Sequence, residues 1–269
     1  GVGDRYWRNE GDGIFVDATV EAGFADSYGK GLGVIPADFD GDGDLDLYVA
    51  NDSTENRLWV NDGDGTFSDG TLLSGAGVNA RGLTEAGMGL ASCDFDLDGD
   101  LDLYITNFDD ESNTLYRNEG GGVFAPSSFE AGLAEVSLPY VGFGTGFLDY
   151  DNDGDLDVVI LNSRSKPTIL RNDTPATNHW IQIQLRGTTS NRDGIGARVT
   201  VTAGKLTQID EVHSGRSYQS DYGKRLHFGL GQRSSIEQIR VNWIGGGVDI
   251  IRDVKVDRVV TIVEGSRQI

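Results

Sequence analysis

The sequence predicts an all-β protein made of propeller-type four-stranded blades followed by a small antiparallel β-sandwich. Three observations support this fold class. A set of four short motifs returns about every 55 residues, and apolar runs rich in β-branched and aromatic residues lie between turns of Asn, Asp and Gly. In addition, no window has the apolar period of an α-helix. With 269 residues, the chain has the length of one large or two ordinary domains.

An acidic segment of nine residues occurs three times. It reads DFDGDGDLD at residues 38–46, DFDLDGDLD at 94–102 and DYDNDGDLD at 149–157. Asp occupies every odd position and Gly the sixth, and a run of strand-forming residues follows each copy (LYVA, LYIT and VVIL). The three copies therefore predict three loops, each of which leads directly into a strand.

Three further motifs keep the same spacing. The first is an aromatic-containing segment with a turn of Asn, an acidic residue and Gly, and it occupies residues 6–15, 58–67 and 115–124, with a shortened copy at 169–173. The second is Gly-apolar-Gly, seven residues before each acidic loop, at residues 31–33, 87–89 and 142–144. The third is Ala-Gly-apolar, at residues 22–24, 76–78 and 131–133. Four motifs in one order, three times over, predict blades of about four strands.

The number of blades is incomplete for a closed propeller. Residues 1–28 supply the back half of a blade, two full repeats follow, and a third ends near residue 172. These are about three and a half blades, whereas closed propellers use about four to eight. The chain also lacks an initiator Met and opens within a repeat, so we expect a processed chain or a part of a longer protein. Otherwise the open edges must be covered by another chain, by the second part or by self-assembly.

A polar segment that contains Pro, DTPATN at residues 173–178, separates the repeats from a different pattern. We therefore expect two domains, at residues 1–174 and 175–269. The second begins with HWIQIQLR, in which apolar and polar residues alternate as in a half-buried strand. Gly-rich turns separate its expected strands, which are residues 179–186, 198–203, 206–212, 236–243, 248–251 and 258–263. This pattern predicts an antiparallel sandwich.

Charge is divided unevenly along the chain. The formal net charge is −21; residues 1–180 hold 34 acidic and 9 basic residues, and residues 181–269 hold 9 and 13. So acidic a body argues against sequence-independent nucleic-acid binding and fits a bound cation or a basic partner. No apolar stretch of about 18 residues is present, so we expect no membrane span. The single cysteine, Cys93, precedes the second loop in an apolar strand and is expected to be a buried thiol.

The acidic loops have the chemistry of calcium sites. Calcium takes six to eight oxygen ligands, and alternate Asp residues on a curled loop turn their carboxylates to one centre, with Gly at the sixth position allowing the sharp turn. An EF-hand is excluded, because the twelfth position lies in a strand rather than carrying Glu. Zn²⁺ is disfavoured without Cys or His, and Mg²⁺ seldom uses an all-protein cage. Solvated acidic turns are the alternative, but five carboxylates in nine residues repel one another without a cation.

We therefore expect about three calcium ions with a structural role. The expected carboxylate ligands, at positions one, three, five and nine, are Asp38, Asp40, Asp42 and Asp46, then Asp94, Asp96, Asp98 and Asp102, and then Asp149, Asp151, Asp153 and Asp157. By analogy with other curled calcium loops, the seventh residue contributes its main-chain carbonyl; these residues are Asp44, Asp100 and Asp155.

Residues 1–174 resemble FG-GAP/VCBS repeats, the calcium-loop blades of integrin-α-like propellers. The second part resembles the ASPIC/UnbV domain. The matching segments are GIGARV at 194–199, Glu211-Val212 with Gly215 and Tyr218, LHFGLG at 226–231 and VNWIG at 241–245, where Ile244 replaces a common Pro. This order of modules, typical of the cartilage acidic protein-like family, implies an exported protein of adhesion, matrix or surface type, with no established catalytic residues to transfer.

The sequence thus favours a non-enzymatic extracellular calcium-binding structural or adhesion protein. Its expected partner is another protein, a glycan or a second copy, and the basic second domain is expected to dock on the acidic repeats of a neighbour. One alternative is a lectin with aromatic platforms at Trp7, Trp59 and Tyr116, although their common register favours packing between blades.

The other alternative is an enzyme-associated protein of biosynthesis, because UnbV-type domains occur in such settings and propellers host active sites. Only three His residues, all in or beside the second domain, weigh against it. Of these, His213 lies in a segment, EVHSGRSYQS, that has two interpretations: a polar pocket for a glycan or an anion, or, as we favour, a turn packed on the sandwich. His227 and His179 are expected to be strand residues.

Overall fold

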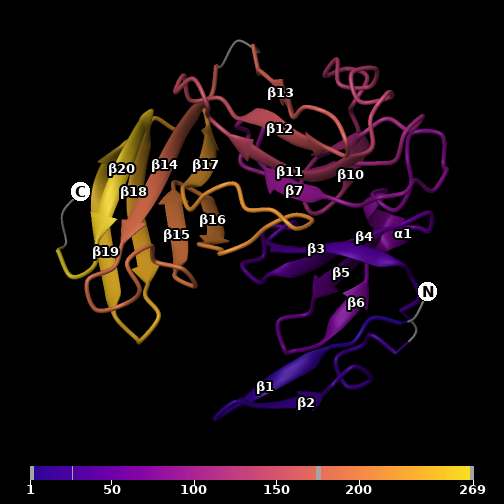
Figure 1. Cartoon of the computed structure of the whole chain (residues 1–269). Helices are drawn as coiled ribbons and strands as arrows, with labels where there is room; N and C mark the ends of the chain where they lie inside the picture. The colour runs from indigo at the N-terminus through magenta and orange to yellow at the C-terminus, as the bar shows by residue number, and fades with distance from the viewer. Residues whose placement is uncertain (1–2, 26, 174–176, 267–269) are drawn as a thin grey trace.

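The computed structural model describes residues 3–25, 27–173 and 177–266, and within them the predicted all-β fold class is confirmed. The one helix in this part of the chain is a single turn, α1 (Thr71–Ser74), and the described residues contain no helix long and apolar enough to cross a membrane. The sheets of the repeats form an arc that runs from β1 and β2 to β13, and the sandwich lies beside it (Figure 1). The expected domain boundary at residues 174/175 falls outside the described residues.

Four antiparallel sheets of two, four, four and three strands form the repeats. They are β1 (Trp7–Gly11) and β2 (Ile14–Asp17); β3 (Gly31–Ala37), β4 (Asp46–Asn51), β5 (Arg57–Asn61) and β6 (Phe67–Asp69); β7 (Leu90–Cys93), β8 (Asp102–Ile105), β9 (Thr114–Asn118) and β10 (Phe124–Pro126); and β11 (Gly142–Leu148), β12 (Asp157–Asn162) and β13 (Thr168–Leu170). Two complete blades thus stand between a half blade and a three-stranded blade. Each acidic loop joins the first strand of its blade to the second, because the run of apolar residues after it forms β4, β8 or β12.

Apolar side chains fill the spaces between successive blades. One cluster joins the first complete blade to the second, and another joins the second to the third. The recurring aromatic position contributes to this packing: Trp59 is 4% exposed against Phe24 of the half blade, and Tyr116 is 1% exposed in the cluster with the first complete blade. Both side chains therefore pack between blades, as favoured from the sequence, whereas Trp7 in β1 is 56% exposed.

The Gly-apolar-Gly motifs allow the innermost strands to approach closely. A Cβ atom at Gly33 would lie 2.7 Å from the carbonyl oxygen of Met88 in the next blade, and one at Gly89 would overlap the carbonyl of Phe143 in the blade after that. Because real Cβ atoms do not approach backbone this closely, only glycine fits these two positions at this blade spacing.

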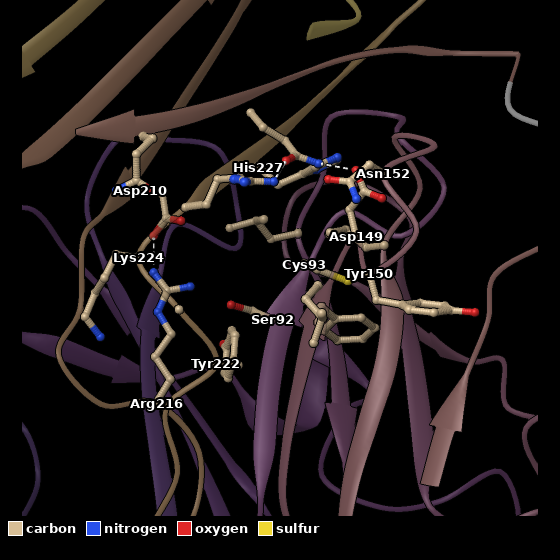
Figure 2. A pocket seen from close by; sticks show the side chains of 18 residues that line it. Ser92, Cys93, Asp149, Tyr150, Asn152, Asp210, Arg216, Tyr222, Lys224 and His227 are labelled. Atoms are coloured by element: carbon tan, nitrogen blue, oxygen red, sulfur yellow. Dashed lines mark hydrogen bonds and ion pairs between the residues drawn. The ribbon is translucent and has the colours of Figure 1, made fainter. Parts of the chain in front are cut away.

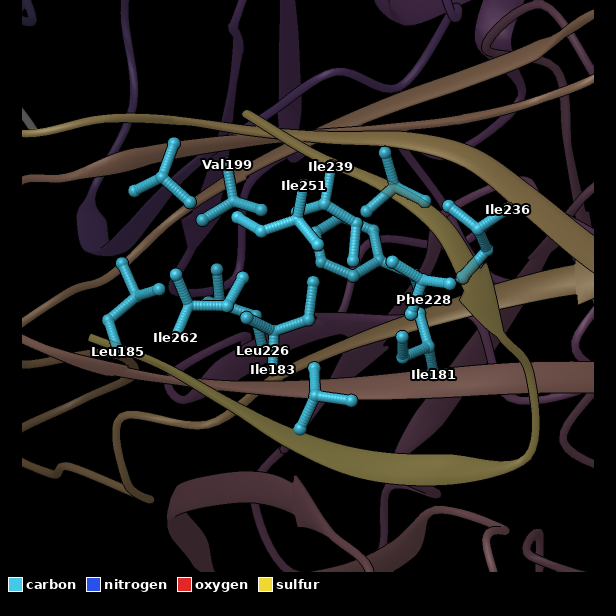
Figure 3. Close-up of a cluster of buried hydrophobic side chains, with 14 of the residues drawn as sticks. Ile181, Ile183, Leu185, Val199, Leu226, Phe228, Ile236, Ile239, Ile251 and Ile262 are labelled. Carbon is cyan, nitrogen blue, oxygen red and sulfur yellow. The ribbon is translucent and has the colours of Figure 1, made fainter. Parts of the chain in front are cut away.

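The second domain is a seven-stranded sandwich of two sheets, β17-β14-β20 and β16-β15-β18-β19. Its strands are β14 (His179–Arg186), β15 (Arg198–Ala203), β16 (Leu206–Glu211), β17 (Leu226–Gly231), β18 (Ser235–Asn242), β19 (Val248–Lys255) and β20 (Arg258–Val263). Apolar residues that alternate along the strands meet between the two sheets, as Figure 3 shows.

One strand pair departs from the expected antiparallel sandwich. β20 runs parallel to β14, with Ile181 opposite Arg258. The chain passes from β19 in one sheet to β20 in the other, so β20 does not form a hairpin with its sheet neighbour and enters beside β14 in the same direction.

Candidate metal centres

Each acidic loop brings three carboxylates together. Their oxygen atoms lie within 4.8 Å of one another in each group, and the groups are Asp38, Asp40 and Asp42; Asp94, Asp96 and Asp102; and Asp149, Asp151 and Asp157. Positions one and three belong to every group, while the third member is position five in the first loop and position nine in the other two. Three oxygen donors at this separation form part of the shell that calcium requires.

The other six predicted positions are placed differently. The side chains of Asp46, Asp98 and Asp153 and those of the three seventh-position residues, Asp44, Asp100 and Asp155, lie outside these groups. The seventh-position residues were expected to act through their main-chain carbonyls, so their side chains do not bear on that expectation. Asp98 is exposed, whereas Asp46 is buried beside the first group.

Backbone hydrogen bonds curl each loop around its first residue. In the first loop, Asp38 accepts from the amides of Gly41 (2.9 Å) and Gly43 (3.1 Å), and the second and third loops repeat the bond from the sixth amide. The sixth residue is Gly with positive φ in all three, as the sequence predicted. The fourth position is also left-handed, including Leu97 at φ 60°, which the side chain gives no reason to expect.

The ninth residue fastens each loop to its blade. Asp102 is 1% exposed, and its two carboxylate oxygens accept the amides of Asn118 (2.8 Å) and Phe95 (3.0 Å). Asp46 and Asp157 make the same pair of bonds in their own loops. A carboxylate oxygen that accepts one hydrogen bond still has a lone pair for a cation, so this position supports both the strand pairing and a metal.

Burial and mutual repulsion perturb the acids strongly. Burial, with repulsion from Asp40 and Asp42, raises the pKa of Asp38 to about 6, and burial raises the pKa of Asp46 to about 7. In the second loop, burial and neighbouring carboxylates raise the pKa values of Asp94 and Asp102 well above their usual range. A bound cation would reverse these shifts.

An orphaned oxygen marks the second group as suited to a cation. Oδ1 of Asp96 is buried and has no hydrogen-bond partner among the described residues, although it belongs to the group with Asp94 and Asp102. An unpaired buried carboxylate oxygen is costly unless something positive faces it. The residues present therefore fit a hard divalent ion.

The second domain lies directly against all three loops. Gln208 donates to the carbonyl of Gly99 (2.7 Å), and Arg198 donates to the carbonyl of Gly43. At the third loop, His227 Nε2 bonds to the carbonyl of Gly154 at 3.0 Å, and its ring stacks on Trp180. From the sequence we expected the basic second domain to dock on the acidic repeats of a neighbour, and that expectation stays a prediction. Within the chain, the second domain contacts the loops through hydrogen bonds to their main-chain carbonyls.

A loop of the second domain, residues 213–225, extends onto the innermost strand of the third blade (Figure 1). Thr145 donates its amide to Ser217 Oγ (3.0 Å), and the ring of Tyr218 stacks on Phe143. A Cβ atom at Gly144 would overlap Ser220. Ser220 therefore occupies the space beside Gly144, just as the inner strand of the following blade occupies the space beside Gly33 and Gly89.

Comparison with known proteins identifies both parts. A family model described as an FG-GAP-like repeat matches residues 2–49 and 38–105, and one described as ASPIC and UnbV matches residues 187–269. The chain thus contains FG-GAP-like repeats followed by an ASPIC and UnbV domain. The third blade lies beyond the repeat match, yet its acidic loop has the same carboxylate group and hydrogen bonds. The loop on the third blade, residues 213–225, belongs to the ASPIC and UnbV domain.

Two curated relatives are similar in sequence to this chain over most of its length. Cartilage acidic protein 1 of Homo sapiens is 27% identical over 259 residues, which cover 89% of this chain and 37% of the relative. Cartilage acidic protein 1 of Mus musculus is 27% identical over 277 residues, covering 96% and 40%. The chain thus spans about two fifths of the length of these relatives. Neither their name nor the two family descriptions state a catalytic activity.

Proposed function

We propose that this chain is a calcium-stabilised structural or adhesion module of an extracellular protein and acts without catalysis. The observation that carries the proposal is the position of the three carboxylate groups: each lies in an FG-GAP-like loop, and each loop is in contact with the ASPIC and UnbV domain. A cation in each loop would hold the loop and the surface on which that domain rests.

In this proposal each loop binds one Ca²⁺. Positions one and three supply carboxylates, positions five and nine complete the set, and position seven supplies its main-chain carbonyl. The ion offsets the repulsion that raises the pKa values of Asp38, Asp94 and Asp102. Extracellular calcium modules bind in the range of about 10⁻⁴–10⁻³ M, which is compatible with short, partly exposed loops of this kind.

The proposed contact with other proteins uses the sheet of β1 and β2. All five residues of β1 are exposed, and the apolar side chains of Trp7, Ile14 and Phe15 are each more than half exposed. Exposed strand edges with apolar side chains favour pairing with another chain. We assign this surface to pairing with further strands, whether of a longer form of this chain, of a protein partner or of a second copy. A lectin is less favoured, because only Trp7 of the three recurring aromatic residues is exposed, whereas Trp59 and Tyr116 are buried and offer no platform to a glycan.

Thermal unfolding with calcium and with a chelator tests the calcium proposal. Calcium should raise Tm, and Asp96→Asn should weaken the increase because it removes a charge from the second group. Asp109→Asn is the matched control, since Asp109 is exposed and lies outside the three loops. Equal Tm values with and without calcium for the unsubstituted chain would rule out a structural calcium.

A separate experiment tests the partner surface. Sedimentation velocity over a range of protein concentrations would report self-association, and Phe15→Ser should reduce it if β1 and β2 form the contact. Ile244→Ser controls for the loss of an exposed apolar side chain, because Ile244 is 56% exposed in the second domain. Self-association that both substitutions leave unchanged would place the contact elsewhere.

A further inference from the structure

A cavity of about 450 Å³ lies between the third blade and the ASPIC and UnbV domain. Figure 2 shows Arg216 and Lys224 on one side of it and Asp149 and Tyr150 on the other. Its volume is within the range of pockets that hold small organic molecules. The cavity is distinct from the three carboxylate groups of the acidic loops, because Asp149 is the one member of these groups that lines it.

The lining of this cavity is locally basic in a chain of net charge −21. Arg216, Lys224 and Arg225 line it together with two acids, Asp149 and Asp210. Asp210 is already paired, at 3.0 Å, with a terminal nitrogen of Arg216. Asp149 accepts hydrogen bonds from backbone amides and from Gln182. Lys224 is paired with Asp221, which stands outside the lining, whereas Arg225 donates to the oxygen of Gln182 and has no carboxylate partner among the described residues. The charge of Arg225 therefore remains for whatever enters the cavity.

Three buried polar atoms around this cavity lack a hydrogen-bond partner among the described residues. They are Nε of Arg216, the hydroxyl of Tyr222 and Nδ1 of His227. Buried polar atoms are nearly always paired with protein, water or ligand. Because Nε2 of His227 faces a carbonyl oxygen, it carries the proton, and Nδ1 is left as an acceptor.

The floor of the cavity is apolar. Phe147 and Leu156 of the third blade line it, and both belong to the cluster between the second and third blades. Tyr222 packs against the same cluster, and the Arg216 guanidinium lies 5.7 Å from the centre of its ring. An apolar body with a small number of polar groups suits such a lining.

We propose that this cavity binds a small organic acid that also carries a hydroxyl group. The acid group pairs with Arg216, where the free Nε–H adds a charge-assisted hydrogen bond, and it accepts a further hydrogen bond from the Tyr222 hydroxyl. The hydroxyl donates to Nδ1 of His227, and the carbon skeleton lies on Phe147 and Leu156. Phenolic acids and sugar acids share this chemistry, and the experiment separates them.

Isothermal titration of the full chain in saturating calcium tests the proposal with two matched pairs of probes. 4-Hydroxybenzoate is compared with neutral 4-hydroxybenzamide, and glucuronate with neutral glucose. At least one acid should bind about tenfold more tightly than its neutral counterpart, as expected for one charge-assisted contact. Binding of the first acid alone identifies an aromatic ligand, and binding of the second alone a sugar acid. The proposal fails if neither acid binds at about 10 mM, or if acid and neutral probe bind equally.

Two substitutions place the binding in this cavity. Arg216→Gln should weaken the acid about tenfold, and Arg252→Gln, the same change of charge in β19, should have no effect. Since Arg216 also holds Asp210, Tyr222→Phe provides a second test that keeps the ring packing. It should reduce affinity with little change in Tm. Acid binding that persists at full strength in both cavity variants would overturn the assignment. None of these variants alters a loop Asp, so their outcome is independent of the calcium proposal.

Discussion

Gln182 in β14 of the sandwich donates a 2.8 Å hydrogen bond from Nε2 to Oδ2 of Asp149, the first residue of the third acidic loop. The amide is 1% exposed, and its oxygen accepts a hydrogen bond from Arg225 at 2.8 Å. A buried side chain of one domain thus holds a carboxylate of the other. The state of the acidic loop and the docking of the second domain are therefore physically linked.

Replacing Gln182 should weaken this link. Gln182→Ala leaves an oxygen of Asp149 without its buried donor, which costs about 1–3 kcal/mol. We expect a lower Tm and faster proteolysis between the domains, measured by limited digestion in calcium. Gln238→Ala in β18 serves as the control. A digestion rate equal to that of the unsubstituted chain would show that this bond does not hold the domains together.

Calcium affinity should depend on pH between about 4 and 7. The pKa of Asp38 is raised to about 6 and that of Asp46 to about 7, mainly by burial. Without calcium, a raised pKa favours the folded protein below the unfolded value near 4, and this stability is lost as pH rises through 6–7. In calcium the trend reverses, because the ion binds the ionised form.

Tm measured from pH 4 to pH 8, once with calcium and once with a chelator, tests this. The two curves should diverge as pH rises and meet at the acidic end. Parallel curves across the range would contradict a role for these carboxylates in calcium binding.

Positions five and nine of the second loop should differ in effect. Asp102 is buried and accepts two backbone amides, whereas Asp98 is exposed and outside the carboxylate group. We expect Asp102→Asn to reduce calcium affinity about tenfold and to lower Tm. Asp98→Asn should have the smaller effect on both. Titration calorimetry measures the calcium affinity of both variants. A larger loss of affinity in Asp98→Asn than in Asp102→Asn would show that position five, rather than position nine, is the stronger ligand in this loop.

The contact at Gly144 can be tested by an exchange of volume. A Cβ atom there overlaps Ser220, so Gly144→Ala should destabilise the chain by about 1–3 kcal/mol. The double variant Gly144→Ala with Ser220→Gly should recover part of this loss, because it restores the space. Gly247→Ala is the control, since its nearest neighbours are at 3.6 Å. Additive effects of the two substitutions in chemical denaturation would count against the contact.

Local patterns were sufficient to predict most of the fold. β14, β15 and β20 have the bounds expected from alternation of polar and apolar residues, and each acidic loop leads into a buried strand. Cys93 is buried, as its apolar neighbours indicated. These features depend on residues close in sequence, where periodicity and turn chemistry are informative.

Features that depend on distant residues were not predictable. The left-handed Leu97 and the parallel pairing of β20 with β14 are imposed by tertiary structure. The contacts of Gln208 with Gly99 and of Thr145 with Ser217 join residues 109 and 72 positions apart. Neither Gln208 nor Ser217 stands out in the sequence. The cavity involves Arg216 from the EVHSGRSYQS segment, but His213 does not line it.

The loop at residues 213–225 has a consequence for the repeat array as a whole. Repeat arrays expose a fresh interface at each end and need a terminal unit with a different surface to stop further stacking. Ser220 and Tyr218 take the place of another inner strand against Gly144 and Phe143. The ASPIC and UnbV domain therefore covers the inner strand of the third blade, the surface on which a further blade would otherwise stack.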